Sequence, residues 1–203
     1  MPEIVSPFLP LFSAAVGGYL LGSVPFGIVM ARLFGLGDLR QIGSGNIGAT
    51  NVLRTGNKPA AALTLILDAA KGGVAVLIAR ALFADDAAQI AGFCAFLGHL
   101  YPVWLGFKGG KGVATFLGTL AALSLPLGVI ACALWLLTAA VMRFSSLSAL
   151  VAAAGTPVVA LLIGRVDLVL VTVLMAALVY YRHGENIARL RTGTEPKIGA
   201  SKP

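Results

Sequence analysis

The sequence has 203 residues, of which 58% are hydrophobic and only 11% are charged. Because soluble domains usually carry about 25% charged residues, this composition excludes an ordinary water-soluble protein, and the length predicts a single domain covering residues 1–203. The net charge of +7 is compatible with nucleic-acid binding. The basic residues alternate with apolar segments, however, so we expect them to face anionic lipid and expect no nucleic-acid partner.

Seven apolar segments follow one another along the chain. They cover about residues 9–31, 59–83, 87–107, 112–125, 127–142, 146–164 and 166–181. A helix crosses the hydrocarbon core of a membrane in about 20 residues, and the first three and last two segments fit this length. The fourth and fifth are shorter and are separated by Pro126, so they form either two tilted crossings or one re-entrant hairpin. We therefore predict an all-α membrane protein with seven transmembrane helices.

Lysine and arginine residues predict the orientation of these helices, because cytoplasmic loops are rich in them. Twelve lie after the first, third and fifth segments and in the C-terminal tail, whereas only Arg80 and Arg165 lie on the other side. The twelve are Arg32, Arg40, Arg54, Lys58, Lys108, Lys111, Arg143, Arg182, Arg189, Arg191, Lys197 and Lys202. The first residues include Glu3 but no Lys or Arg, unlike a cleavable signal peptide. We predict a periplasmic N-terminus and a cytoplasmic C-terminus.

The first polar concentration follows the first apolar segment. It contains three glycines within residues 43–48, and its hydrogen-bonding side chains are Ser44, Asn46, Thr50, Asn51 and Arg54. Glycines allow a ligand to approach the backbone closely, and a guanidinium binds phosphate through a planar fork of donors. The segment therefore predicts a substrate pocket, with a flexible membrane-surface loop as the alternative.

A second concentration, Phe107-Lys108-Gly109-Gly110-Lys111-Gly112, leads directly into the fourth apolar segment. Glycines before a helix expose backbone N–H groups to an anion, and the helix dipole favours negative charge there. The segment lacks the GxxxxGK[ST] pattern of a nucleotide-binding P-loop. It predicts phosphate binding, with a simple positively charged glycine turn as the alternative.

Further polar residues stand near the predicted cytoplasmic side. His183 and Asn186 follow the last apolar segment, and Glu185 is spaced to pair with Arg189. Other residues with polar side chains are Arg143, Ser145, Ser146, Asp68, Lys71 and His99. Asp68 and Lys71 are three residues apart inside an apolar segment, so we expect them to pair within the helix bundle. We interpret His99 as a hydrogen-bonding group at a helix end rather than a base. With only two, widely separated histidines, no metal site and no cofactor are predicted.

Taken together, the motifs resemble those of the bacterial acyl-phosphate-dependent glycerol-3-phosphate acyltransferases. The resemblance extends over about residues 22–199. It depends on GSVPFG at 22–27, GSGNIGATNVLR at 43–54, LDAAKG at 67–72, GHLYPVW and FKGGKG within 98–112, and HGENIARL and GTEPK within 183–197. Tyr101 stands where phenylalanine is common, and Gly184 stands where a charged residue is expected. The HxxxxD signature of another acyltransferase class is absent, since Trp104 and Ala188 occupy the Asp position.

The resemblance implies transfer of a fatty acyl group from acyl phosphate to the 1-hydroxyl of glycerol 3-phosphate, giving lysophosphatidate and phosphate. It also implies seven helices in the bacterial inner membrane, a cytoplasmic active site and no use of acyl-CoA. A separate acyl-phosphate synthase is implied as the source of the donor, and the protein is expected to be a monomer.

Residue roles follow as hypotheses. The predicted donor-phosphate site consists of Gly109, Gly110, Lys111 and Gly112. The predicted pocket residues are Ser44, Asn46, Thr50, Asn51 and Arg54. The predicted glycerol-phosphate site consists of Arg143, Ser145, His183 and Asn186. Among these, we expect Ser44, Lys111, His183 and Asn186 to take part in catalysis. The proton acceptor stays open between His183 and the acceptor's own phosphate, and direct transfer is favoured over a covalent Ser44 intermediate.

Two readings from other classes remain. An organic-phosphate transporter would explain the intramembrane Asp68 and Lys71 and the glycine-rich segments, but no inverted repeat is visible. A noncatalytic membrane scaffold would leave the glycine–lysine and Ser/Asn/Thr clusters without a purpose.

Overall fold

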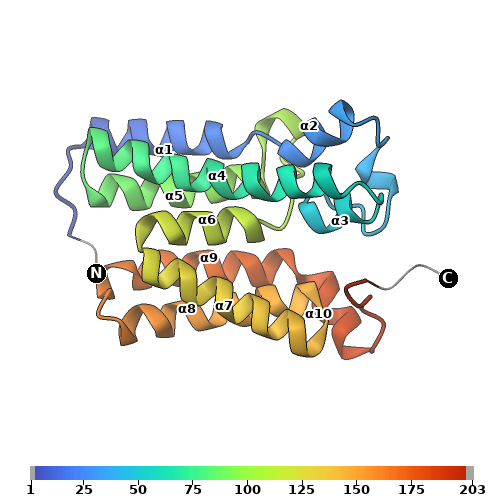
Figure 1. Cartoon of the computed structure of the whole chain (residues 1–203). Coiled ribbons are helices and arrows are strands. Elements are labelled where there is room, and N and C mark those ends of the chain that lie inside the picture. The colour runs from blue at the N-terminus through green and yellow to red at the C-terminus, as the bar shows by residue number, and fades with distance from the viewer. Residues whose placement is uncertain (1–2, 200–203) are drawn as a thin grey trace. The chain divides into compact units, whose positions relative to one another are not determined.

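The computed structural model describes residues 3–199, and in this range it contains helices, turns and loops but no β-strand (Figure 1). The prediction of an all-helical protein is confirmed. The described chain forms two compact units, Glu3–Leu125 and residues 126–199, while the single-domain assignment stays a prediction. Lys202, one of the twelve residues used to predict orientation, lies outside the described residues.

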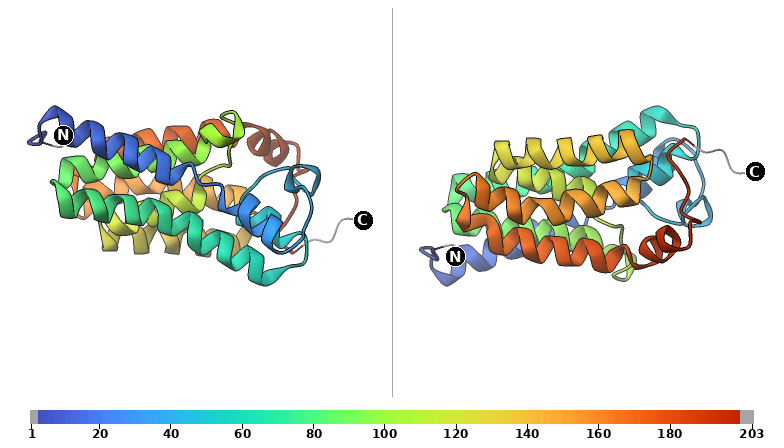
Figure 2. Two further views of the ribbon diagram at one scale, coloured as in Figure 1. Left: turned by 90° about the horizontal axis from the view of Figure 1, so that it is seen from above. Right: turned by 90° about the horizontal axis from the view of Figure 1, so that it is seen from below.

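The first unit is a bundle whose long helices lie side by side (Figures 1 and 2). Its helices are α1 (Phe8–Gly22), α2 (Phe26–Leu33), η1 (Leu39–Gln41), α3 (Ala49–Leu53), α4 (Lys58–Leu82), α5 (Asp85–Leu100), η2 (Val103–Leu105) and α6 (Val113–Leu123). Glycine allows α1 and α5 to approach closely, because a Cβ at Gly18 or Gly22 would overlap the backbone of Ala91 or Ala95. Small residues at helix contacts are typical of membrane bundles, in which packing replaces the hydrophobic effect.

Local sequence explains where the helices of this unit start and stop. The first apolar segment breaks between α1 and α2, where Pro25 lacks an N–H and restricts Val24 before it. The α4 helix begins after Asn57, whose side chain accepts a hydrogen bond of 2.9 Å from the N–H of Ala60. Pro59 occupies the first turn, where a missing N–H costs nothing. The predicted first span is therefore one membrane-crossing segment made of two helices, α1 and α2.

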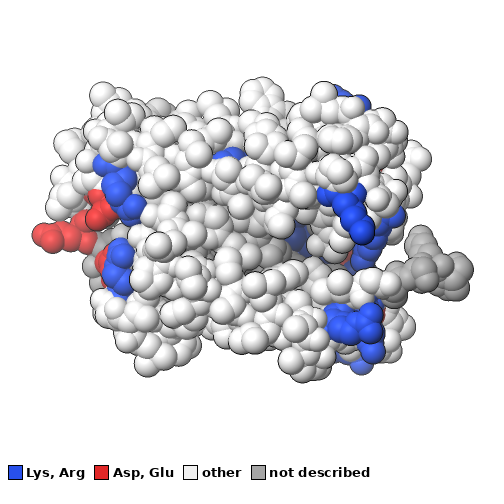
Figure 3. Space-filling view, viewed as in Figure 1, with Lys and Arg blue, Asp and Glu red and all other residues white. Residues whose placement is uncertain are grey.

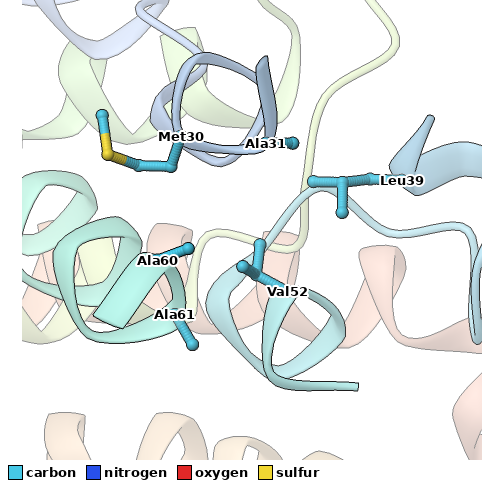
Figure 4. Close-up of a cluster of buried hydrophobic side chains, with 6 residues drawn as sticks. All are labelled: Met30, Ala31, Leu39, Val52, Ala60 and Ala61. Carbon is cyan, nitrogen blue, oxygen red and sulfur yellow. The ribbon is translucent and has the colours of Figure 1, made fainter. Parts of the chain in front are cut away.

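A small apolar core holds the long segment between α2 and α4 in place (Figure 4). Leu39 and Val52, both from this segment, pack against residues of the two flanking helices. The cluster consists of Met30, Ala31, Leu39, Val52, Ala60 and Ala61. Burial of such side chains contributes roughly 1.5–3 kcal/mol for each large one. The polar residues between Leu39 and Val52 are thus carried by a folded segment rather than by a flexible loop.

The second unit contains the remaining helices, apart from the first residue of α7. They are α7 (Leu125–Met142), α8 (Ser145–Leu162), η3 (Val166–Leu168), α9 (Val169–Arg182) and α10 (Gly184–Arg191). The α9 helix packs along α8, and the Tyr180 hydroxyl donates to the carbonyl of Leu150 across this contact. The break before α7 is at Ser124, and Pro126 lies in the first turn of the new helix.

In the described part of the chain, five segments are long and apolar enough to cross a membrane. They are Phe8–Leu33, Lys58–Leu82, Asp85–Leu105, Leu125–Met142 and Ser145–Leu162. Val166–Arg182 passes the same test only together with α10, from which it is bent by 63°. The α6 helix has 11 residues and a length of roughly 16 Å, about half of the hydrocarbon thickness. The count of seven crossings and the orientation of the termini therefore stay predictions.

Charged side chains gather near the helix ends of each unit, on the face shown in Figure 3. In the first unit α4 and α5 are antiparallel neighbours joined by a short turn, so Arg80 lies at the opposite end from Lys58 and Lys108. Arg80 contacts Asp85 at 2.7 Å, and in the second unit Arg165 contacts Asp167 at 2.7 Å. Arg80 and Arg165, the two arginines predicted to lie on the non-cytoplasmic side, thus each have an acidic partner.

Candidate active site

The Ser44 segment, residues 39–54 from the start of η1 to the C-cap residue of α3, contains a tight turn organised by Asn51. Its glycines Gly43 and Gly45 have φ angles of 55° and 69°, which side chains with a Cβ rarely adopt. The backbone N–H and the hydroxyl of Ser44 lie 3.0 and 3.3 Å from the Asn51 amide oxygen, to which both donate. The Asn51 amide nitrogen donates to the carbonyl of Leu39 at 2.9 Å. Asn51, which is buried, therefore ties the turn to its apolar core.

Other predicted pocket residues lie around the same turn. A Cβ at Gly43 would come within 2.8 Å of Cδ of Arg54, so the arginine side chain lies against the glycine backbone. The Asn46 side chain accepts from the N–H of Ile47 at 2.9 Å, and Thr50 is in the first turn of α3. The structure thus brings Ser44, Asn51 and Arg54 together. Asn46 and Thr50 lie nearby in the same segment.

The Gly109–Gly112 loop is packed against the C-terminal end of α5. The N–H groups of Gly109 and Gly110 donate to the carbonyls of Leu100 and His99, at 3.0 and 3.1 Å. These two groups cap α5, which differs from the expectation that they point towards an anion. The N–H groups of the first turn of α6 have no carbonyl partner within their own helix and lie at its positive end. Lys111 lies two residues before α6 begins at Val113.

The two glycine segments of the first unit are connected. The Arg40 guanidinium donates to the carbonyl of Lys108 at 3.0 Å, which links the Ser44 segment with the residue before the Gly109–Gly112 loop. In the sequence, Arg40 served only as an indicator of orientation. The two residues are 68 positions apart in the chain, so no local sequence pattern indicates this contact.

The expected Asp68–Lys71 pair is confirmed. The Lys71 ammonium lies 2.8 Å from an Asp68 carboxylate oxygen, and both side chains are almost completely buried. Nδ1 of His99 lies 3.6 Å from the same oxygen. The His99 ring therefore lies beside this buried ion pair, whereas the sequence indicated only that His99 is at a helix end.

In the second unit, polar groups converge on Glu195. The Ser146 hydroxyl and the Asn186 amide each donate to one carboxylate oxygen at 2.6 Å, and Nε of Arg189 donates to the other at 2.7 Å. Burial raises the pKa of this carboxyl, but these hydrogen bonds and the charge of Arg189 outweigh it. The net pKa of Glu195 lies below its ordinary value.

Glu195 belongs to the GTEPK motif at 193–197, and no role was predicted for it. The predicted partner of Arg189 is Glu185, and that contact is longer, at 3.8 Å. A signal was present, because Glu195 is the one acidic residue after position 185 in a tail rich in Lys and Arg. Such an isolated carboxylate indicates a specific basic partner, although the sequence does not identify which one.

His183 lies at the junction of α9 and α10 and is buried. Its Nδ1 lies 2.7 Å from the carbonyl oxygen of Val179. Because a carbonyl only accepts, Nδ1 carries the hydrogen, and Nε2 is the proton-accepting nitrogen of the neutral ring. Asn186 lies in the first turn of α10, and His183 is the residue directly before that helix.

The tail returns to the start of α8, near Arg143. The N–H of Ile198 donates to the Arg143 carbonyl at 2.6 Å, and the Arg143 guanidinium donates back to the Ile198 carbonyl at 3.2 Å. Arg143 has a φ of 62°, unusual for a residue other than glycine. Ser145, predicted as a site residue, begins α8, and its neighbour Ser146 contacts Glu195. Within residues 3–199, no group of three or more His, Cys, Asp or Glu side chains is placed to hold a metal ion.

Comparison with known proteins identifies relatives over nearly the whole chain. The family model for glycerol-3-phosphate acyltransferase matches residues 12–193. Glycerol-3-phosphate acyltransferases of Cereibacter sphaeroides and Jannaschia sp. are each 64% identical over 199 residues, which cover 98% of this chain and 95% and 98% of those proteins. Among solved structures, the glycerol 3-phosphate form of PlsY (YgiH), an integral membrane glycerol 3-phosphate acyltransferase, has a TM-score of 0.88 and 41% identity, covering 93% of this chain and 96% of that one. Its lysophosphatidic acid form has a TM-score of 0.85 and 38% identity, with 93% and 95% covered.

Proposed function

The chain belongs to the glycerol-3-phosphate acyltransferase family, and we propose that its acyl donor is a fatty acyl phosphate. The acyl group passes to the 1-hydroxyl of glycerol 3-phosphate, and the products are lysophosphatidate and inorganic phosphate. The protein is an integral membrane protein with bacterial relatives. We place it in the bacterial inner membrane as a monomer, with its active site on the cytoplasmic face and its donor supplied by an acyl-phosphate synthase.

The observation that carries the donor assignment is the Gly109–Gly112 loop. It leads directly into the positive N-terminal end of α6, which packs against the apolar helices α4 and α5. An acyl phosphate has an apolar acyl chain at one end and an anionic phosphate at the other. Its chain can therefore stay in the bilayer while its phosphate reaches this loop. Lys111 supplies a point charge for the same phosphate. Stabilising the charge on a leaving group in this way is a large term in acyl transfer.

The reaction needs little further chemistry. The hydroxyl oxygen attacks the acyl carbonyl carbon and forms the new ester bond. The bond between that carbon and the phosphate oxygen then breaks, and its electron pair leaves with the phosphate. The hydroxyl proton passes to Nε2 of His183 or to the phosphate of the acceptor. The hydrogen bond from His183 to Val179 supports the first route, because it fixes the tautomer that accepts a proton at Nε2.

The remaining predicted residues position the substrates. We assign Asn46, Thr50, Asn51 and Arg54 to the pocket, and Arg143, Ser145 and Asn186 to glycerol-phosphate binding. The Asn186 amide donates to Glu195, which holds its side chain in a fixed orientation. Such pre-organisation lowers the entropic cost of bringing two substrates together.

Purified protein in detergent micelles tests the proposed activity. With acyl phosphate and glycerol 3-phosphate, we expect phosphate release that requires both substrates, and Lys111→Ala should lower turnover by at least about tenfold. Thermal unfolding of the variant should match that of the unmodified protein. Near-normal turnover would remove Lys111 from the site, and uptake of substrate into vesicles without turnover would favour the transporter.

Ser44 is assigned to positioning rather than to a covalent intermediate. Its hydroxyl donates to the amide oxygen of Asn51, and an amide oxygen cannot remove the proton from a nucleophile as a histidine does. Incubation with acyl phosphate alone should therefore leave the protein unmodified. Mass spectrometry that finds an acyl group on Ser44 under these conditions would establish the covalent route instead.

A further inference from the structure

The buried cluster of Asp68, Lys71 and His99 has no part in the proposed chemistry. Its side chains are between 1% and 4% exposed, inside a bundle that has few charges. Ionisable groups at such depth are costly and usually serve a function. Asp68 and Lys71 come from α4 and His99 comes from the last turn of α5. The cluster therefore connects α4 with the C-terminal end of α5, from which the chain continues to the Gly109–Gly112 loop.

His99 connects this cluster with the Gly109–Gly112 loop. One ring nitrogen, Nδ1, faces Asp68, and a Cβ at Gly110 would overlap the other, Nε2. The His99 backbone carbonyl also accepts from the Gly110 N–H at 3.1 Å. The ring thus lies between the buried carboxylate and the backbone of the loop, so that its orientation limits where the loop can be.

Lys71 connects the cluster with the other glycine segment. Its ammonium donates to the carbonyl of Val24 at 2.8 Å, at the break between α1 and α2. Just beyond the break, Gly27 lies so close to the Ile47 carbonyl that a Cβ would overlap it. The first residues of α2 are therefore held against both the buried lysine and the Ser44 segment.

We propose that Asp68, Lys71 and His99 form a positioning cluster for the donor, in which Asp68 orients the His99 ring and the ring sets the position of the Gly109–Gly112 loop. The inference depends on the proposed function, since that loop is assigned to the donor phosphate. His99 acts through the loop and is a positioning residue, not a catalytic one. Its loss should weaken use of acyl phosphate more than use of glycerol 3-phosphate.

His99 is the suitable residue to replace. Removal of Asp68 or Lys71 alone would leave a buried charge without its partner and would strongly destabilise the protein. Removal of His99 leaves the 2.8 Å pair of Asp68 and Lys71 in place. His99→Leu removes both ring nitrogens at similar size. His99→Gln keeps a polar group at the distance of Nε2, whereas His99→Asn keeps one only near Nδ1.

The test measures KM for each substrate and kcat of the purified full-length variants. We expect His99→Leu and His99→Asn to raise KM for acyl phosphate by about tenfold while KM for glycerol 3-phosphate changes by less than about twofold. His99→Gln should recover most of the donor KM. Thr119→Val is the control, because Thr119 is buried in the same bundle and its hydroxyl has no hydrogen-bond partner among residues 3–199. It should leave both KM values unchanged.

The outcomes separate this inference from the proposed function. If the unmodified protein shows no turnover with acyl phosphate, the proposed function fails. If it turns over but His99→Asn lowers only kcat, or raises both KM values equally, the positioning role is wrong and His99 is merely structural. Lack of recovery by His99→Gln would also overturn it. Since His99→Asn and His99→Leu make the same prediction, one unfolded variant leaves the test intact.

Discussion

Replacement of Gly110 by alanine is expected to lower kcat/KM by at least about a hundredfold, because displacement of a substrate-positioning loop by about 1 Å has an effect of that size. The new methyl group would overlap the ring of His99. That ring is buried beside Asp68 and has little room to move. The loop must therefore shift away from α5, which also breaks the hydrogen bond from the Gly110 N–H to the His99 carbonyl.

The matched control is Gly184→Ala. Gly184 is the first residue of α10, and among the described residues no atom outside its chain neighbours and its own helix backbone lies within 4 Å of the position that a Cβ would take. This variant should keep the activity of the unmodified protein. Steady-state kinetics on both purified variants, together with their thermal unfolding, distinguish loop displacement from loss of folded protein. Retention of more than half of the activity by a folded Gly110→Ala variant would contradict the described packing of the loop.

The second large effect is expected from Glu195→Gln. At neutral pH we expect the free energy of unfolding to fall by about 2–4 kcal/mol, because hydrogen bonds to charged groups contribute about 1.5–3 kcal/mol each. Three donors, from Ser146, Asn186 and Arg189, meet on the carboxylate. A glutamine offers one acceptor oxygen, and its NH₂ group faces donors. Chemical unfolding in detergent micelles measures the difference.

The stabilising effect of Glu195 is expected to depend on pH. The pKa of Glu195 in the folded protein lies below its ordinary value of 4.5, so the ionised carboxyl stabilises the fold above about pH 4.5. That contribution should disappear as the pH falls through the folded pKa. The stability difference between the unmodified protein and Glu195→Gln should therefore be full at neutral pH and shrink in acid. A difference that does not change with pH would show that the charge of Glu195 is not responsible.

Glu185→Gln is the control for charge alone. Glu185 is 89% exposed and lies 3.8 Å from the same arginine, Arg189. Exposed ion pairs of this kind contribute little to stability, so we expect no measurable change. A loss as large as that of Glu195→Gln would instead point to a general effect of tail charge.

Much of the molecule follows from the order of its residues. The apolar segments require helices, because a backbone inside a membrane must satisfy its own hydrogen bonds. Prolines and glycines mark helix limits such as those at Pro25 and Gly112. The i, i+3 spacing of Asp68 and Lys71 was enough to predict their pairing, which the structure confirms. These features are local, and their causes lie within a few residues of one another.

Contacts between distant residues were decided only by the tertiary structure. The convergence of Ser146, Asn186 and Arg189 on Glu195, and the His99 ring against Asp68 and Gly110, join helices and loops whose relative positions no local pattern specifies. The same is true of the Gly109 and Gly110 N–H groups, which cap α5. Sequence alone therefore determined that this is a helical membrane protein with phosphate-binding types of residue. Tertiary packing decided which of those groups hydrogen-bond to one another within the protein. The reason is that such a bond forms only when the fold brings donor and acceptor within reach.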